Sequence, residues 1–380
     1  MRTTLFFIYS IFLITPLFSQ NVKVEDYQVA VSKAKNLIAD GNWNWGQKGN
    51  TVTSNNANGS LTFKTFFSSL PTAWFVDVNA LAGKDFSDYS HSVNINSSFR
   101  KYVLTDKDLF ASSRLTLSHA NFYKQIESKL TVGFGYGRYI NATSLAKAVR
   151  IEDHLLRERI ITDYLPKEVM LIVANIIERE QEYKDIYGKT TYETFWFDDI
   201  EREIKNSDEV SPEGIGSIGI LRMRQVLFNI NERVNDRYYG WDIVTGILFP
   251  LSTRDKSPAG NPNLSVTAEY SYPINWNMQI NSSLISSTPI DSSFFKSFDI
   301  STKFDFIYEL SNRINFVANY QLVSNKPLLN SKFLIEHYLN ASFLYYLENN
   351  IYFILSTGVT KQGSDPQILR STVGIQYNLL

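Results

Sequence analysis

The chain contains no cysteine among its 380 residues, and this absence excludes several kinds of protein at once. Without cysteine there are no structural disulfides, no zinc site built on thiolates and no lipid anchor on an N-terminal cysteine. The net charge of −1 provides no basic surface for nucleic acid, so we expect no nucleic-acid partner. Beyond the N-terminus no apolar run is long enough to form a transmembrane helix, which excludes a helical membrane protein.

Residues 1–19 have the composition of an export signal. Arg2 supplies the positive charge, and a short apolar core follows that is interrupted by Pro16. A cleavage site fits between Ser19 and Gln20, and the apolar core is too short for a membrane anchor. We therefore predict that residues 1–19 are removed and that the mature protein is exported.

The stretch 366–380 shows the pattern that organises most of the chain. Alternate positions are apolar and the positions between them are polar, which is typical of a strand with two different faces. The apolar set is Leu369, Val373, Ile375, Tyr377 and Leu379. The same alternation recurs at 264–272, 298–310 and 314–322. In a soluble β-sandwich the apolar face would be the core, whereas in a membrane barrel it faces lipid and the polar face lines the lumen.

Strand number and loop length favour the membrane barrel. Alternation begins at Leu37, is interrupted by a predicted loop at 50–59, and gives about fourteen antiparallel strands in all. The strands are predicted near 60–68, 73–83, 89–103, 108–123, 125–141, 237–252, 262–274, 276–288, 293–311, 312–325, 331–347, 350–361 and 366–379. Short turns at 273–276 and 310–313 alternate with longer Ser-, Asn- and Pro-rich loops at 252–261 and 286–293. Outer-membrane barrels have short periplasmic turns and longer outer loops, so this sorting predicts a cell outer membrane location.

Residues 142–236 differ from the rest of the chain. Apolar residues recur there at helical spacing in four segments, and Pro166 suits the start of the second. We predict a small helical domain inserted between two parts of the barrel, 20–141 and 237–380. The insert has 13 Lys and Arg against 19 Asp and Glu, a net charge of −6. Its acidic surface is either solvated helix faces or a docking site for a basic partner.

The side of the membrane on which the insert lies follows from counting strands. Eight predicted strands separate residue 236 from the C-terminus, and an even number of crossings returns the chain to the side on which it ends. The C-terminus of such barrels is periplasmic. We predict that 142–236 lies in the periplasm, beneath the barrel or folded up into it as a plug, where it could bind a periplasmic protein.

Two groups of residues are predicted to line the lumen. Three glycines, Gly133, Gly135 and Gly137, share one face opposite Phe134 and Tyr136. They indicate either a bend in a curved wall or a smooth stripe against which another segment packs. Charged residues of both signs fall on the polar faces of their strands: Arg114, Glu269, Asp299, Lys303, Asp305, Glu309, Glu336 and Arg370. They indicate either ordinary hydration and cross-strand pairing or a pore lining without strong ion selectivity.

No motif indicates catalysis, a metal or a cofactor. Gly214, Gly216 and Gly219 spell GxGxxG, but no buried strand precedes them, so we interpret them as a flexible start to a helix. Ser118 and His119 are adjacent on a predicted strand and therefore face opposite sides. The other histidines have no metal-like spacing, and we expect the protein not to be an enzyme.

The run 132–152, together with Tyr-Gly-Trp-Asp at 239–242, resembles porin-like outer-membrane barrel proteins of the Bacteroidota. This resemblance implies an all-β transmembrane barrel embedded in outer-membrane lipid. We expect it to act as a channel or as a membrane platform for a periplasmic partner through 142–236. An outer-membrane enzyme that modifies lipid is the alternative, and it would require a converging set of Ser, His and Asp.

Overall fold

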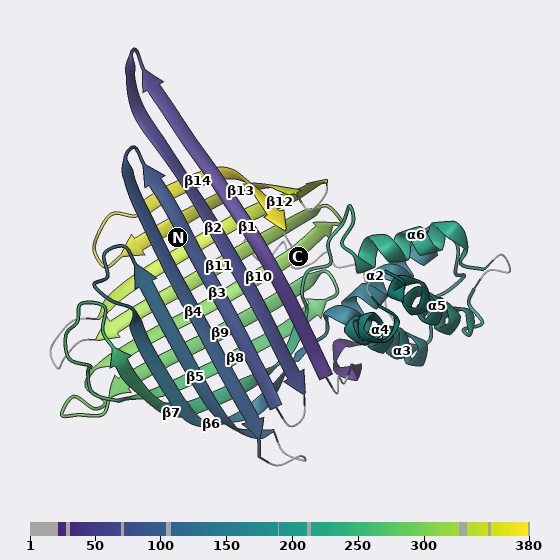
Figure 1. Ribbon diagram of the computed structural model, residues 1–380, viewed down its shortest axis with the longest axis horizontal. Helices are drawn as coiled ribbons and strands as arrows, with labels where there is room; N and C mark the ends of the chain where they lie inside the picture. Colours follow the sequence, from purple (N-terminus) through teal and green to yellow (C-terminus); the bar gives the residue numbers. More distant parts are fainter. Residues whose placement is uncertain are drawn as a thin grey trace, which may run out of the picture.

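The computed structural model describes residues 22–27, 31–69, 72–103, 108–188, 190–210, 214–326, 333–348 and 351–378. The export signal predicted at 1–19 lies outside the described residues. The described chain forms a β-barrel with a helical domain beyond one of its ends (Figure 1).

Fourteen antiparallel strands among the described residues make one closed barrel, as predicted. Each strand pairs with its neighbours in sequence, and β14 pairs with β1 to complete the ring. The strands are β1 (Val31–Lys48), β2 (Thr51–Ser69), β3 (Thr72–Asp85), β4 (Asp88–Tyr102), β5 (Leu109–Ala120), β6 (Glu127–Asn141), β7 (Tyr238–Ser252), β8 (Asn263–Asn275), β9 (Met278–Pro289), β10 (Phe298–Ser311), β11 (Ile314–Lys326), β12 (Leu334–Glu348), β13 (Ile351–Gln362) and β14 (Ile368–Asn378).

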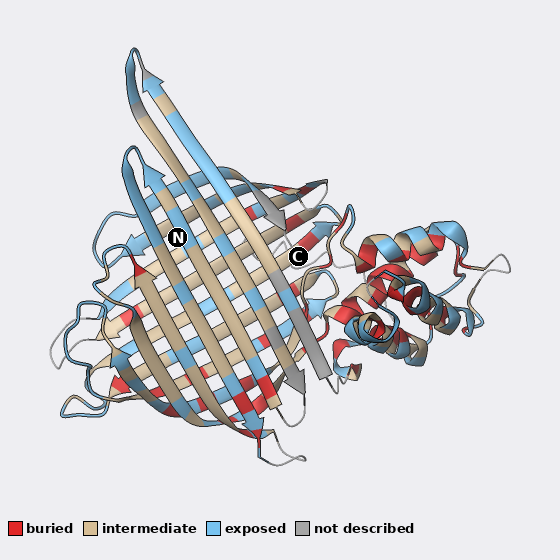
Figure 2. Cartoon of the chain, viewed as in Figure 1, coloured by how far each residue is buried: buried red, intermediate tan, exposed pale blue. Residues whose placement is uncertain are grey.

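The outer face of the barrel is apolar and the inner face is polar. On β6 and β7, Phe134 and Ile243 are 67% and 46% exposed, whereas Asp242, next to Ile243 on β7, is only 1% exposed. Successive residues of a strand point to opposite faces, so the exposed apolar set lies on the outside of the closed barrel and the other set faces the lumen. Figure 2 shows exposed or half-exposed residues over the barrel wall and buried ones concentrated near the insert and within it.

The loop predicted at 50–59 is wrong, because β2 begins at Thr51 and the turn is confined to Gly49 and Asn50. The Asn-, Ser- and Gly-rich composition disfavours a strand locally. Continuous pairing with β1 overrides that preference, and the Trp43 ring donates a hydrogen bond from Nε1 to Asn55 Oδ1 at 3.1 Å. The β1–β2 hairpin therefore projects well beyond the rest of the wall (Figure 1).

Along the last eight strands the predicted sorting of connections is confirmed, whereas the turns at 49–50 and 86–87, at the end opposite the insert, have only two residues each. Two-residue turns at 276–277 and 312–313 lie at the end of the barrel that carries the helices, and the longer connections at 253–262, 290–297 and 363–367 lie at the other end (Figure 1). Eight strands follow the insert, as counted from the sequence.

The insert contains five helices among the described residues where four were predicted. They are α2 (Thr143–Arg157), α3 (Lys167–Glu178), α4 (Glu180–Tyr187), α5 (Tyr192–Lys205) and α6 (Gly216–Leu227). The missed helix, α4, buries only Tyr183, so it has no apolar stripe to reveal it. The others share one apolar core with the short 3₁₀-helix η2 (Val24–Asp26). None of the described helices is long and apolar enough to cross a membrane.

The two ends of the insert meet where it leaves the barrel. The Ala142 amide donates to the Arg237 carbonyl oxygen at 2.7 Å, and the Arg237 amide donates to Thr143 Oγ1 at 3.0 Å. The helices lie beyond the rim rather than within the lumen (Figure 1). The side of the membrane on which the insert lies stays a prediction.

Candidate functional site: the lumen and the insert junction

A buried ionic cluster joins the insert to the short-turn rim of the barrel. Glu309, near the end of β10, binds Arg150 of α2 and accepts from Arg237 Nη2 at 2.7 Å. It also accepts from the backbone amide of Asn235 at 3.0 Å. Glu309 and both arginines are buried, so the carboxylate is neutralised and hydrogen-bonded by groups from the insert and its return segment.

Further contacts extend this cluster along the rim. Arg150 Nη1 donates to Asn312 Oδ1 in the β10–β11 turn at 3.0 Å and lies 3.4 Å from Glu232 Oε2. His154 Nε2 lies 2.8 Å from Glu232 Oε1. Arg237 Nη2 donates to the Trp276 carbonyl oxygen in the β8–β9 turn at 2.9 Å. These contacts fasten the insert to two successive short turns, so its position relative to the barrel is fixed.

A second ionic group fills the lumen beside β4–β8. Arg100 Nη1 lies 2.5 Å from Asp242 Oδ2, and its guanidinium stacks between the rings of Phe75 and Phe110, 5.0 Å from each ring centre. Glu269 Oε2 lies 3.7 Å from Arg100 Nη2. Because Arg100 and Asp242 are buried, this part of the lumen holds packed side chains rather than open water.

The predicted glycine stripe lies directly beside this group. A Cβ on Gly135 would collide with the Phe110 ring, and one on Gly133 would collide with the Thr245 carbonyl oxygen of β7. Gly137 has a φ of +122°, which few other residues adopt. The stripe therefore lets β6 and β7 approach closely and is covered by Phe110 of β5 rather than by the insert.

A chain of hydrogen bonds continues the packed region through β6, β8 and β9. The hydroxyls of Tyr139 and Ser271 lie 2.6 Å apart, and Ser271 Oγ donates to Asn281 Oδ1 at 2.8 Å. Gln279 Nε2 donates to Asn281 Oδ1 and to the Tyr238 carbonyl oxygen, each at 2.9 Å. Ser271 and Gln279 are almost completely buried, so strands β4–β9 form a packed half of the lumen toward the insert.

Strands β10–β14 form an open half. Lys303 and Asp305 of β10 and Arg370 of β14 line one cavity of about 520 Å³ with the polar residues between them. Asn319 Nδ2 donates to Asp305 Oδ1 at 2.7 Å. Arg370 and Thr372 are exposed although they are on the inner face of β14, so water fills the lumen beside this wall.

The predicted lining residues thus fall into separate places. Arg114 and Glu269 lie 3.7 Å apart in the packed half, and Lys303, Asp305 and Arg370 share the open cavity. The other three are apart from both groups. Glu309 is at the junction, and Asp299 lies opposite Asn325 in the ladder of β10 and β11. Glu336 Oε2 accepts a hydrogen bond from the Tyr338 hydroxyl at 2.5 Å.

Among the charged residues of these clusters that were not predicted are two in each cluster. Arg100 and Asp242 lie on the polar side of β4 and β7, so the alternation that identified Arg114 could have found them. Arg150 and Arg237 lie on a helix and in a connecting segment, where alternation gives no signal. Only the folded chain brings these two to Glu309.

Residues considered for chemistry do not converge on one site. Ser118 pairs with Asn94 on the inner face, whereas the His119 ring lies 5.5 Å from His91 and contacts Tyr123. Of the GxGxxG glycines, Gly216 begins α6 with a φ of +62°. In the part of the chain that the structure describes, no three His, Asp or Glu side chains gather as a metal site. The predicted absence of catalysis and cofactors stays a prediction.

A closed antiparallel barrel with an apolar outer face and a polar inner face defines an outer-membrane β-barrel protein, and the chain is located in the outer membrane. No protein-family model matches the chain, and no curated protein matches it.

Solved structures with a likeness to the chain are outer-membrane proteins. OmpF of Salmonella typhi, solved in complex with daunomycin, has 8% identity and a TM-score of 0.34 over 94% of this chain and 99% of that chain. OpdQ of Pseudomonas aeruginosa has 7% identity and a TM-score of 0.31 over 92% and 98%. The KdgM porin has 7% identity and a TM-score of 0.29 over 90% and 98%. Likenesses this distant carry no further argument, and the resemblance to Bacteroidota proteins stays a prediction.

Proposed function

We propose that the protein is a channel that passes small hydrophilic solutes through the open half of its lumen. The observation that carries this proposal is the cavity of about 520 Å³ lined by Lys303, Asp305 and Arg370, whose side chains face water inside a closed barrel. Positive and negative groups lie on the same wall, so the channel has no strong preference for either sign of charge.

Swelling of proteoliposomes in an uncharged pentose tests the channel. Gly358 of β13 lines the open cavity, and Val359 beside it is on the outer face. Gly358→Trp should narrow the lumen and slow swelling, whereas Val359→Trp places the same ring in lipid and should leave the rate unchanged. Swelling no faster than in protein-free liposomes, or equal slowing by both variants, contradicts the proposal.

We propose further that the insert is on the periplasmic side. Support comes from its place at the short-turn end and from the even number of strands that follow it. Single cysteines in this cysteine-free chain provide the test. Asn206 is exposed in the insert, and Ala259 is exposed in a long loop at the opposite end. A membrane-impermeant maleimide on intact cells should label Ala259→Cys and spare Asn206→Cys, and the reverse result would invert the topology.

A platform role for a periplasmic partner is the second candidate. The insert is held rigidly at the rim and presents exposed apolar side chains, among them Ile186, Ile218 and Leu221, which are 53–70% exposed. A photoreactive residue at Ile218 should give one discrete cross-linked species in cells, and Leu221→Asp should abolish it. Glu201→Asp, on another helix of the insert, is the control. Absence of a discrete species would remove this candidate.

A further inference from the structure

The seam where β14 meets β1 is the shortest pairing in the described barrel. Only Ile38–Gly41 pair with Ile375–Asn378. Beyond that point β1 continues from Asn42 to Lys48 bonded only to β2, and β14 from Ile368 to Gly374 is bonded only to β13. Among the described residues, the two strands therefore diverge into a wedge that opens toward the end with the long loops.

The wedge lies in the membrane-facing part of the wall. The outer residues of β14 beside it are apolar, and Leu369, Val373 and Ile375 are all more than half exposed. A crossing strand needs about 9–11 residues, so the unpaired part of β14 is most of its crossing. Hydrocarbon cannot satisfy backbone N–H and C=O groups, and each group left without a partner costs several kcal/mol. Water or a polar ligand must reach this edge.

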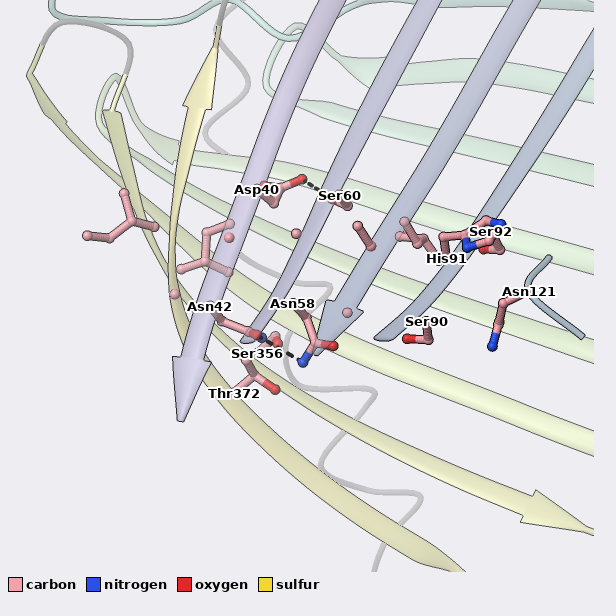
Figure 3. A pocket seen from close by; sticks show the side chains of 18 of the residues that line it. Asp40, Asn42, Asn58, Ser60, Ser90, His91, Ser92, Asn121, Ser356 and Thr372 are labelled. Atoms are coloured by element: carbon pink, nitrogen blue, oxygen red, sulfur yellow. Dashed lines mark hydrogen bonds between the residues drawn. The ribbon is translucent and has the colours of Figure 1, made fainter. Parts of the chain in front are cut away.

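A cavity of about 530 Å³ lies on the inner side of the seam (Figure 3). Residues of β1, β2, β13 and β14 line it together, and Gly41 and Ile375, which are partners at the seam, are among them. The cavity therefore borders the seam on the side of the lumen. Its lining includes the apolar residues Ile354 and Ile375.

The polar lining of this cavity consists mainly of amides and hydroxyls. Asn58 Nδ2 donates to Asn42 Oδ1 at 3.3 Å, and Ser356 and Thr372 line the cavity with them. Asp40 is the one carboxylate among the described lining residues, and it accepts from Ser60 Oγ at 2.9 Å. Amides and hydroxyls suit a neutral head group with hydroxyls of its own, and the apolar side chains of Ile354 and Ile375 suit an attached hydrocarbon chain.

We propose that the β1–β14 seam is a lateral opening through which an amphipathic small molecule with an uncharged, hydroxyl-rich head group passes between the lumen and the apolar layer of the membrane. The proposal rests on the proposed channel function, because the lumen supplies the aqueous side of the route. The seam proposal also specifies a class of substrate, which the proposed channel along the barrel axis does not.

The accessibility of the seam is tested by two single cysteines in proteoliposomes. Ile375 and Phe353 are ladder partners at the same depth on the outer face of neighbouring strands, and only Ile375 lines the cavity. A charged, membrane-impermeant maleimide reacts with a thiolate that water reaches. Ile375→Cys should be labelled at least about tenfold faster than Phe353→Cys. Equal rates in variants that both keep heat-modifiable migration would overturn the opening.

The substrate class is tested by protection of the same cysteine. Octyl glucoside, below the concentration at which it forms micelles, should slow labelling of Ile375→Cys severalfold, whereas glucose should not. Equal protection by glucose, or no protection by the glycoside, would refute an amphipathic ligand. Pentose swelling separates the two proposals: normal swelling with equal labelling rates refutes only the seam, and fast Ile375→Cys labelling without swelling refutes only the axial channel.

Discussion

The packed half of the lumen, β4–β9, and the open half, β10–β14, are built on the same alternation of apolar and polar residues. In the packed half the large inner ring of Phe110 meets Gly135, and Arg100 and Asp242 are buried. In the open half the inner face carries residues such as Thr372 and Arg370, which stay exposed. Alternation therefore decides which side of the wall a residue faces, and the residues that lie across the lumen from it decide whether that side is filled.

The largest expected effect is at the insert junction. Glu309→Ala would leave the buried charge of Arg237 without its carboxylate and that of Arg150 with Glu232 alone, at a cost of about 3–5 kcal/mol. Lys303→Ala, on the same strand in the open half, should change stability by less than about 0.5 kcal/mol. Guanidinium titration of the protein in lipid vesicles measures both. Similar losses of stability would show that the junction contributes no more to stability than the open half.

Replacing an inner-face glycine in the packed half and one in the open half should change stability by different, smaller amounts. Gly133→Ala forces a methyl group onto the β7 backbone and should cost about 1–3 kcal/mol. Gly358→Ala places its Cβ 3.4 Å from Asn340 Oδ1, an ordinary contact, and should be tolerated. The fraction of folded, heat-modifiable protein after refolding reports the difference. An unchanged folded fraction for Gly133→Ala would mean that β6 and β7 are packed less closely than the structure shows.

The insert should be more stable in mild acid than at neutral pH. Burial raises the pKa of Glu152 to about 7 from its ordinary value of 4.5, and a hydrogen bond from the Leu165 amide only partly offsets this. The folded insert therefore holds a proton that the unfolded chain releases. Its contribution to stability is full below pH 4.5 and is lost as the pH rises through about 7, a change of about 3 kcal/mol.

Helical circular dichroism during thermal unfolding, recorded from pH 5 to 8, measures this dependence. Glu152→Gln carries no titrating proton and is the matched control, so its unfolding temperature should change less across that range. Parallel profiles for the two proteins would contradict the assignment to Glu152.

The smallest effect on stability is expected in the open half. Arg370→Gln removes an exposed charge from the cavity wall and should change the free energy of unfolding by less than about 0.5 kcal/mol. Lys303 and Asp305 then remain, and the loss of one positive charge should shift the reversal potential of a planar bilayer toward cation preference. No shift would place Arg370 outside the path of the ions.

The barrel could be predicted from the sequence because one period repeats in every strand, and each repeat strengthens the others. The exception, the hairpin beyond Gly49, has no apolar alternation and is held by continuous pairing with β1 across a two-residue turn. The junction could not be predicted, because Arg150, Arg237 and Glu309 come from three unrelated elements. The distinction between packed and open halves depends on which strands face each other, and a single strand does not contain that information.

The hydrogen bonds that join the two ends of the insert bear on the order of folding. β6 and β7 are ladder partners separated by the whole insert, and closing so long a loop from an unfolded chain costs conformational entropy. An insert that folds first on its own core brings Ala142 and Arg237 together. We expect its amides to resist hydrogen exchange before those of the strands during refolding, and the opposite order would refute this. The insert thereby makes a hairpin out of two strands that are remote in the chain, and so gives the barrel a local starting point for assembly.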